Sequence, residues 1–113
     1  MKKVTADITP GVCGLHTVIS VESIGNMRFK VHTESACNNV RRLVAALPEI
    51  NAYEELFKPL CDIVIIQLAE KYLSHRTCVV PVGILKAVEV AAGLALPADV
   101  VIKLIEEDVE PEA

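Results

Sequence analysis

The apolar and polar residues of the N-terminal third alternate in a way that predicts three β-strands. Residues 3–8, 15–23 and 27–34 place an apolar side chain at nearly every second position, and this period of two is typical of strands that bury one face. Gly25 and Asn26 lie between the second and third strands, and both tolerate the positive φ of a tight hairpin. The sequence therefore predicts an antiparallel hairpin with a further strand before it.

A three-residue loop at residues 24–26 predicts the register of this hairpin. It sets Val21 opposite Phe29 on the apolar face. A two-residue loop at Gly25-Asn26 would instead set Glu22 beside Phe29. This register is disfavoured, because a one-residue slip sends the apolar side chains to the wrong face of the sheet. Extended outward, the preferred register places Cys13 opposite Cys37 at the open end of the hairpin.

The rest of the chain predicts helices followed by one last strand. Apolar residues recur at helical spacing over residues 36–47, 52–57, 59–73 and 82–96. Residues 98–105 alternate again and are apolar on nearly both faces, as in an interior or interface strand. We therefore expect an α+β fold, with an antiparallel sheet of about four strands, three N-terminal and one C-terminal. About four helices should pack mainly on one face of this sheet.

Length and composition are consistent with one domain. The chain has 113 residues, of which 52% are hydrophobic, and this is sufficient for a contiguous core. We assign residues 1–105 to a single α+β domain and residues 106–113 to an acidic C-terminal tail. The N-terminus lacks the apolar run of a secretory signal, and no stretch offers the roughly 20 uninterrupted apolar residues of a membrane span. We expect a cytoplasmic protein without a membrane partner.

The charge pattern argues against nucleic acid as a partner. The formal net charge is -4, and the chain contains two tyrosines, two phenylalanines and no tryptophan. Proteins that bind nucleic acid usually carry a basic patch or a platform of stacking aromatic residues. Neither feature is present in this sequence.

Cysteine and histidine residues carry the candidate chemistry. Cys13 with His16, and His75 with Cys78, form two pairs whose members are three positions apart. Zinc accepts thiolates and imidazoles in a tetrahedral site, and three thiolates also suit an iron–sulfur cluster. Cys37 lies in the first turn of a predicted helix, where backbone N–H groups stabilise a thiolate. We expect a zinc or iron–sulfur site built from Cys13, Cys37 and Cys78, with His75 as the fourth ligand and His16 in reserve.

Each of these residues also has a simpler interpretation. The predicted register sets His16 beside Glu34, which favours a surface ion pair. Cys37 and Cys78 would pack as buried thiols, since free cysteine is among the most buried residue types. His75 would interact with the dipole at a helix C-terminus. These structural interpretations remain open beside the metal site.

Cys61 is set apart from this site. Its neighbours at helical spacing are apolar, so we expect a thiol in the hydrophobic core. A single helix over residues 59–73 would also separate it from His75 by roughly 20 Å, at the α-helical rise per residue. Cys61 is therefore not a candidate ligand.

The predicted helix over residues 82–96 has an unusually wide apolar arc. Only Lys86, Glu89 and Gly93 interrupt its apolar surface. Helices normally bury a single stripe, so this helix either lies centrally in the fold or packs against a second subunit. We expect a homodimer through residues 82–96.

Three segments carry a resemblance to a known family. Residues 11–17, residues 35–37, and residues 75–97, which open with His75-x-x-Cys78, resemble an uncharacterised family of small cysteine-containing proteins. Its members are typical of methanogenic archaea and anaerobic bacteria. The resemblance covers most of the chain and implies an anaerobic, iron–sulfur-rich setting, with no assigned activity.

Three classes of function follow from these observations. The first is a metal- or iron–sulfur-binding accessory protein that uses Cys13, Cys37 and Cys78. The second is a thiol redox or sulfur-carrier protein that uses Cys13 and Cys37. The third is a structural or interaction module, a homodimer without active chemistry. No Gly-rich phosphate loop or activated serine arrangement supports another enzyme class.

Overall fold

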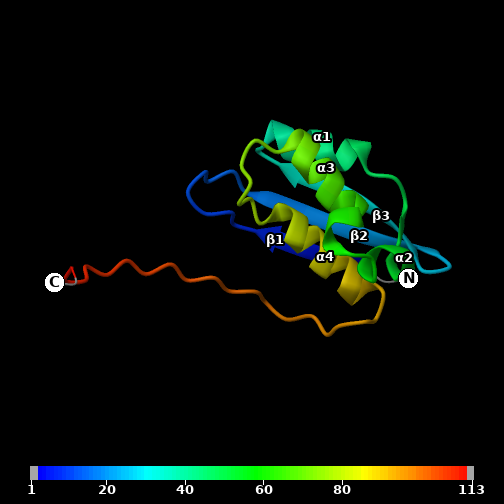
Figure 1. Ribbon diagram of the computed structural model, residues 1–113. Coiled ribbons are helices and arrows are strands. Elements are labelled where there is room, and N and C mark those ends of the chain that lie inside the picture. The colour runs from blue at the N-terminus through cyan, green and yellow to red at the C-terminus, as the bar shows by residue number, and fades with distance from the viewer. Residues whose placement is uncertain (1–2, 112–113) are drawn as a thin grey trace.

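A four-stranded antiparallel sheet forms the centre of the fold in the computed structural model, which describes residues 3–111 (Figure 1). The strands lie side by side in chain order: β1 (Lys3–Ile8), β2 (Thr17–Gly25), β3 (Arg28–Ser35) and β4 (Ile50–Asn51). The helices are α1 (Asn38–Ala46), α2 (Ala52–Leu56), α3 (Val64–Tyr72) and α4 (Val80–Ala91), with a 3-10 turn at Leu60–Asp62. The expected α+β class is confirmed. Residues 1–2 and 112–113, which belong to the assigned domain and tail, lie outside the described residues.

Helices cover one face of the sheet, and the other face is polar. Ile19, Val21 and Phe29 are buried, whereas Glu22 and Lys30 on the opposite face are exposed. Helix α4 packs across β1 and β2, and α1 packs on β3 (Figure 1). The hydrophobic core therefore lies between the sheet and a single layer of helices, as the alternation in the strands requires.

The β2–β3 hairpin has a different register from the predicted one. Val21 lies opposite Val31, two residues beyond the predicted partner Phe29. The strands are joined through Asn26 and Met27, whose φ angles of 54° and 58° are both positive, as a type I′ turn requires. A bulge just before the turn accommodates the extra residue. A shift of two residues leaves every side chain on its own face, so the apolar pattern is the same in both registers.

The fourth strand is formed by residues that the sequence pattern did not indicate. Strand β4 (Ile50–Asn51) pairs with Arg28 and Phe29 of β3. Residues 98–105, where the last strand was expected, belong to no strand or helix and extend away from the sheet (Figure 1). Burial of Ile50 beside Phe29 places β4 at this edge of the sheet. The expectation of a C-terminal strand at residues 98–105 is therefore wrong for the single chain.

The helix expected over residues 59–73 is divided in two. The 3-10 turn at Leu60–Asp62 ends at Ile63, which has an extended backbone with φ of -71° and ψ of 126°, and α3 begins after it. The break changes which side chains face the core. Cys61 is exposed, so the expectation of a core thiol is wrong, and Ile63 is buried close by in its place.

Glu55 connects α2 to the start of α3. Its buried carboxylate accepts a hydrogen bond from the Val64 backbone N–H at 2.9 Å and one from the Lys58 ammonium at 2.8 Å. The hydrogen bond to Glu55 raises the pKa of Lys58 above its ordinary value of 10.5, because the carboxylate stabilises the charged ammonium. A group whose pKa is raised by folding contributes stability that is fully present below its pKa in the unfolded chain. This contribution is lost as the pH rises through its pKa in the folded protein. The contribution of Lys58 is therefore retained at neutral pH.

Helix α4 lies at the centre of the helical layer. Ile84 and Val88 are fully buried, and the helix contacts β1, β2, α2 and α3. The wide apolar arc thus reflects a central position in the fold. The helix is shorter than predicted, because Gly93 takes a positive φ of 75° and its N–H bonds the Val90 carbonyl at 3.0 Å. With a bond from the Leu94 N–H to the Glu89 carbonyl, this forms a Schellman motif that ends the helix.

Candidate functional site

Cys13 and Cys37 lie at the same end of the sheet. Ile8 at the end of β1, Thr17 at the start of β2 and Ser35 at the end of β3 are neighbours across the strands. Cys13 belongs to the loop between β1 and β2, and Cys37 lies two residues after the end of β3, just before α1. The chain therefore brings both cysteines to the open end of the hairpin.

The loop between α3 and α4 reaches the same end. The Asn39 side chain at the start of α1 donates a hydrogen bond to Ser74 Oγ at 3.4 Å. Within this loop, the Cys78 N–H donates to the His75 carbonyl at 3.3 Å. We call this region the cysteine end, and its members are Cys13, Cys37, His75 and Cys78.

The side chains of the cysteine end are not gathered into a ligand set. Among residues 3–111, no three Cys, His, Asp or Glu side chains lie close enough together to hold a metal ion. Cys13 is exposed, whereas Cys37 and Cys78 are half-buried and pack against the core. Continued outward, the observed register would place Leu15 opposite Cys37. The predicted register that placed Cys13 there is wrong, and the metal site itself remains a prediction.

Cys37 occupies the cap position of α1 and not its first turn. Its backbone has φ of -93° and ψ of 119°, and its N–H donates to Ser35 Oγ at 3.0 Å. The Cys37 carbonyl accepts the bond from the Arg41 N–H at 3.1 Å that opens the helix. Ser35 thus positions the cap residue through its hydroxyl. Cys37 therefore lies at the N-terminal end of α1.

His16 takes part in a surface ion pair. Its Nε2 contacts Asp7 Oδ1, and both side chains are exposed to solvent. The expected partner Glu34 lies opposite Val18 in the observed register. The interpretation of His16 as a surface residue fits this contact, with Asp7 in place of Glu34.

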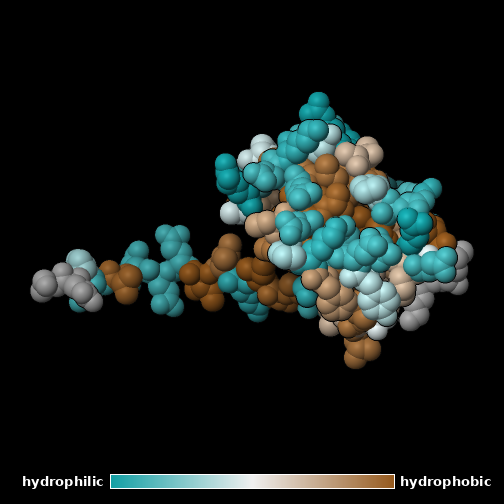
Figure 2. Space-filling model, turned by 45° about the vertical axis from the view of Figure 1, so that its right-hand side comes forward, coloured by the Kyte–Doolittle hydropathy of each residue, from teal (hydrophilic) through white to brown (hydrophobic). Residues whose placement is uncertain are grey.

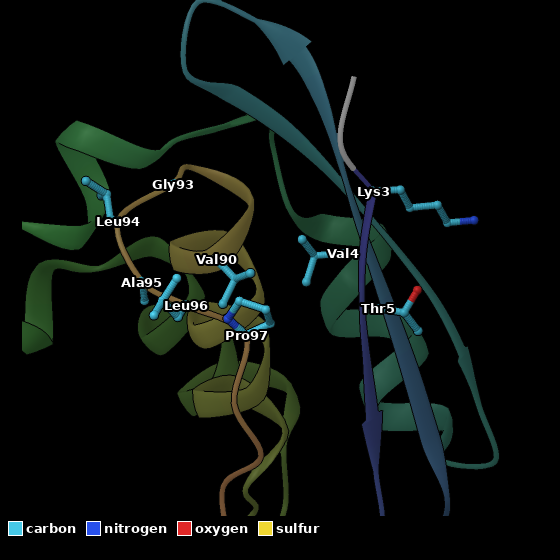
Figure 3. Close-up of a pocket in the computed structure, with 9 residues that line it drawn as sticks. All are labelled: Lys3, Val4, Thr5, Val90, Gly93, Leu94, Ala95, Leu96 and Pro97. Carbon is cyan, nitrogen blue, oxygen red and sulfur yellow. The ribbon is translucent and has the colours of Figure 1, made fainter.

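A second candidate site lies at the opposite end of β1 and is lined mainly by apolar residues, together with Lys3 and Thr5. An open hollow of about 790 Å³ lies between residues 3–5 of β1, Val90 of α4 and residues 93–97. Figure 3 shows that Val4 and Val90 point toward each other across this hollow, while Lys3 and Thr5 point away from it. The apolar pattern of α4 was visible in the sequence, but the hollow depends on how α4 lies on β1.

Fold and candidate sites together define a small α+β protein with one helix-covered sheet face, a cysteine end and an apolar hollow. The chain belongs to a family of unknown function, DUF6951, whose model matches residues 4–104. Comparison with curated proteins and with solved structures returned no match. No helix within residues 3–111 has the length and apolar character needed to cross a membrane.

Proposed function

We propose that this protein is a homodimeric interaction module whose copies meet through the apolar surface that follows α4. The observation that carries this proposal is a short stretch of chain in which most large apolar side chains are exposed. These exposed residues are Leu94, Leu96, Val100, Val101, Ile102, Leu104 and Ile105. Burying one such side chain stabilises an interface by about 1.5–3 kcal/mol. Apolar residues concentrated in this way mark an interaction site, unlike single scattered ones.

The end of α4 supports the same interface. Leu94 is 40% exposed and Leu96 is 88% exposed, and both line the hollow beside β1. Figure 2 shows apolar side chains where the C-terminal segment leaves the rounded body. Residues 82–96, the predicted helix through which we expected a homodimer, end beside this hollow. A second copy that covers the hollow would therefore also contact α4.

Self-association is the direct test of this proposal. Sedimentation of the purified chain, with a mass of 12.2 kDa per copy, should give a dimer that dissociates on dilution. Replacing both Leu94 and Leu96 by Glu should weaken the dimer by at least about tenfold, because charge is placed on an apolar contact. Val12→Glu is the matched control, since Val12 is fully exposed in the loop at the other end of β1. A monomer at all accessible concentrations would contradict the proposal.

We also propose a zinc or iron–sulfur site at the cysteine end, formed by Cys13, Cys37 and Cys78 with His75. The proposal is supported by the placement of all four residues at one end of the sheet. Two of the three segments that carry these residues are loops, and binding would require their side chains to move together. The alternative at the same place is a redox or sulfur-carrying dithiol of Cys13 and Cys37.

Metal analysis and a visible spectrum after anaerobic purification test the metal site. Serine at Cys13, Cys37 or Cys78 should each lower metal affinity by more than about tenfold, and binding should weaken as the pH falls, because the ligands bind in their deprotonated form. Cys61→Ser is the control, since Cys61 is exposed and lies outside the proposed ligand set. A folded, colourless and metal-free protein would contradict the metal site. Thiol titration that finds a low-pKa cysteine in such a protein would favour the dithiol.

A further inference from the structure

We infer that residues 98–105 of one copy pair as a parallel β-strand with β1 of a second copy, and that the exchange is reciprocal. The inference rests on the proposed homodimer and names the surface through which it forms. It is carried by an open strand edge and a matching side-chain pattern.

Strand β1 presents an open edge along its whole length. It pairs with β2 on one side and is the outermost strand of the sheet. Its inward-facing residues Val4, Ala6 and Ile8 are only half-buried, although they pack against the core. Unpaired N–H and C=O groups along such an edge are a template for another strand. A strand added here would complete the burial of these three side chains.

Residues 98–105 have the side-chain pattern of a strand for this position. Ala98, Val100, Ile102 and Leu104 would share one wholly apolar face, suited to the helical side of the sheet. The other face would carry Asp99, Val101, Lys103 and Ile105, a mixture suited to the polar side. Leu104 is 91% exposed and Ile105 is 80% exposed in the single chain, so the segment has the apolar surface that strand addition would bury.

One parallel register satisfies both faces. In this register Val4 of β1 lies beside Val100 of the segment. On the same helix-covered face, Ala6 then lies beside Ile102 and Ile8 beside Leu104. The same register sets two opposite-charge pairs side by side on the outer face. These pairs are Lys3 with Asp99 and Asp7 with Lys103. Opposite charges on neighbouring strands are favourable.

An antiparallel arrangement does not give this match. If Asp7 and Lys103 are kept as neighbours in an antiparallel pair, Val4 lies beside Glu106. A carboxylate would then be placed on the apolar face against the helical layer, at the cost of its desolvation. The side-chain pattern therefore favours the parallel direction.

The path of the chain is compatible with the parallel direction, when the two β1 strands of the dimer run the same way. Gly83, near the start of α4, packs against Ile8 at the end of β1, and Val90 lies across the hollow from Val4 (Figure 3). Helix α4 therefore runs antiparallel to β1. After the turn at Gly93 the chain reverses, so a strand that follows would run from the start of β1 toward its end.

The single chain leaves both the segment and the edge of its own β1 open to a second copy. Pro97 restricts the preceding Leu96 to extended conformations, so the chain continues from this point as an extended segment. Figure 2 shows the segment standing away from the body, and Val100 to Ile105 have no backbone hydrogen bonds within the described chain. In an exchanged dimer each copy offers one open β1 edge and one unpaired segment. A two-fold related pair satisfies both at once.

A pair of substitutions on opposite faces of the segment tests the inference in the full chain. Ile102→Glu places a charge on the inner face of both exchanged strands, and the dissociation constant of the dimer should rise on the order of 100-fold or more. Val101→Glu changes the neighbouring residue on the outer face and should alter the dissociation constant of the dimer only a few-fold. Both residues are exposed in the single chain, so neither substitution disturbs the core. Equal effects of the two substitutions would overturn the predicted strand pairing.

Isotope-filtered NMR on a refolded mixture of labelled and unlabelled copies identifies the partner. We expect contacts between Ala6 of one copy and Ile102 of the other. The same contact within a monomer would show that the segment covers its own β1, and would overturn the exchange. A dimer in which Ile102 makes no contact with β1 would overturn this inference while leaving the proposed homodimer intact. A monomer with a free segment would overturn both.

Discussion

Replacing Phe29 by alanine is expected to lower the free energy of unfolding by about 3–5 kcal/mol. Phe29 is 2% exposed and is the largest fully buried side chain of the core. It lies opposite Ser23 on β2 and opposite Ile50 on β4. Truncation removes apolar contacts and leaves a cavity that the surrounding strands fill only in part. Urea unfolding followed by circular dichroism measures the loss.

Lys30→Ala is the matched control, because Lys30 follows Phe29 in β3 and points to the exposed face. Its effect should stay within about 0.5 kcal/mol. Hydrogen exchange gives an independent readout, since the two-residue strand β4 pairs with Phe29 itself and its amides should exchange faster in Phe29→Ala. Similar unfolding free energies for the two variants would show that Phe29 is not a core residue.

Replacing Glu55 by alanine is expected to cost about 2–3 kcal/mol of stability. The carboxylate accepts bonds from the Val64 N–H and from Lys58, and it is only 11% exposed. Its removal leaves a helix-terminal N–H without its acceptor, and takes a negative charge from the N-terminus of α3. Thermal and urea unfolding measure the change in free energy.

Two variants separate the causes of this effect. Glu55→Gln keeps an oxygen acceptor and loses the charge, so its free energy of unfolding should lie between that of the wild type and that of Glu55→Ala. Glu54→Ala removes the neighbouring exposed carboxylate and should change stability by less than about 0.5 kcal/mol. If Glu54→Ala proved as costly as Glu55→Ala, net charge on α2 and not the bond to Val64 would explain the loss.

Features that depend on neighbouring residues could be predicted from the sequence. The alternation at residues 3–8 matches β1 (Lys3–Ile8) at both ends. Asn51 precedes the helix predicted at residues 52–57, and as a residue type favoured at helix N-caps it accepts a bond from the Glu54 N–H at 3.2 Å. Caps and strand alternation arise from local chemistry, so they can be recognised without knowledge of the fold.

The hairpin register could not be predicted, because two registers fit the same pattern. They differ by two residues, which is one full period of a strand. The turn that distinguishes them contains Met27 at a φ of 58°, and methionine is not a residue that signals positive φ. The placement of Cys13 opposite Cys37 depended on this choice.

The cysteine end could be predicted only as a region. Antiparallel pairing brings Cys13 and Cys37 to one end of the sheet, and this follows from the order of the strands. The distances among side chains depend on loop conformations and on the packing of α3 and α4 around Cys78, which no spacing in the sequence encodes. The exposure of Cys61 has the same origin, because the break before α3 is stabilised by Glu55 from another helix.

The sequence by itself determined the strands of the N-terminal hairpin, the start of α2 and the apolar positions of α4. It also determined that residues 98–105 have the pattern of a strand. Only the tertiary structure decided that Ile50–Asn51 forms the fourth strand and that residues 98–105 extend from the body. A helix makes its hydrogen bonds within one segment, but a strand makes them with another. The pattern of a strand is therefore local, while its partner is decided by the assembled fold.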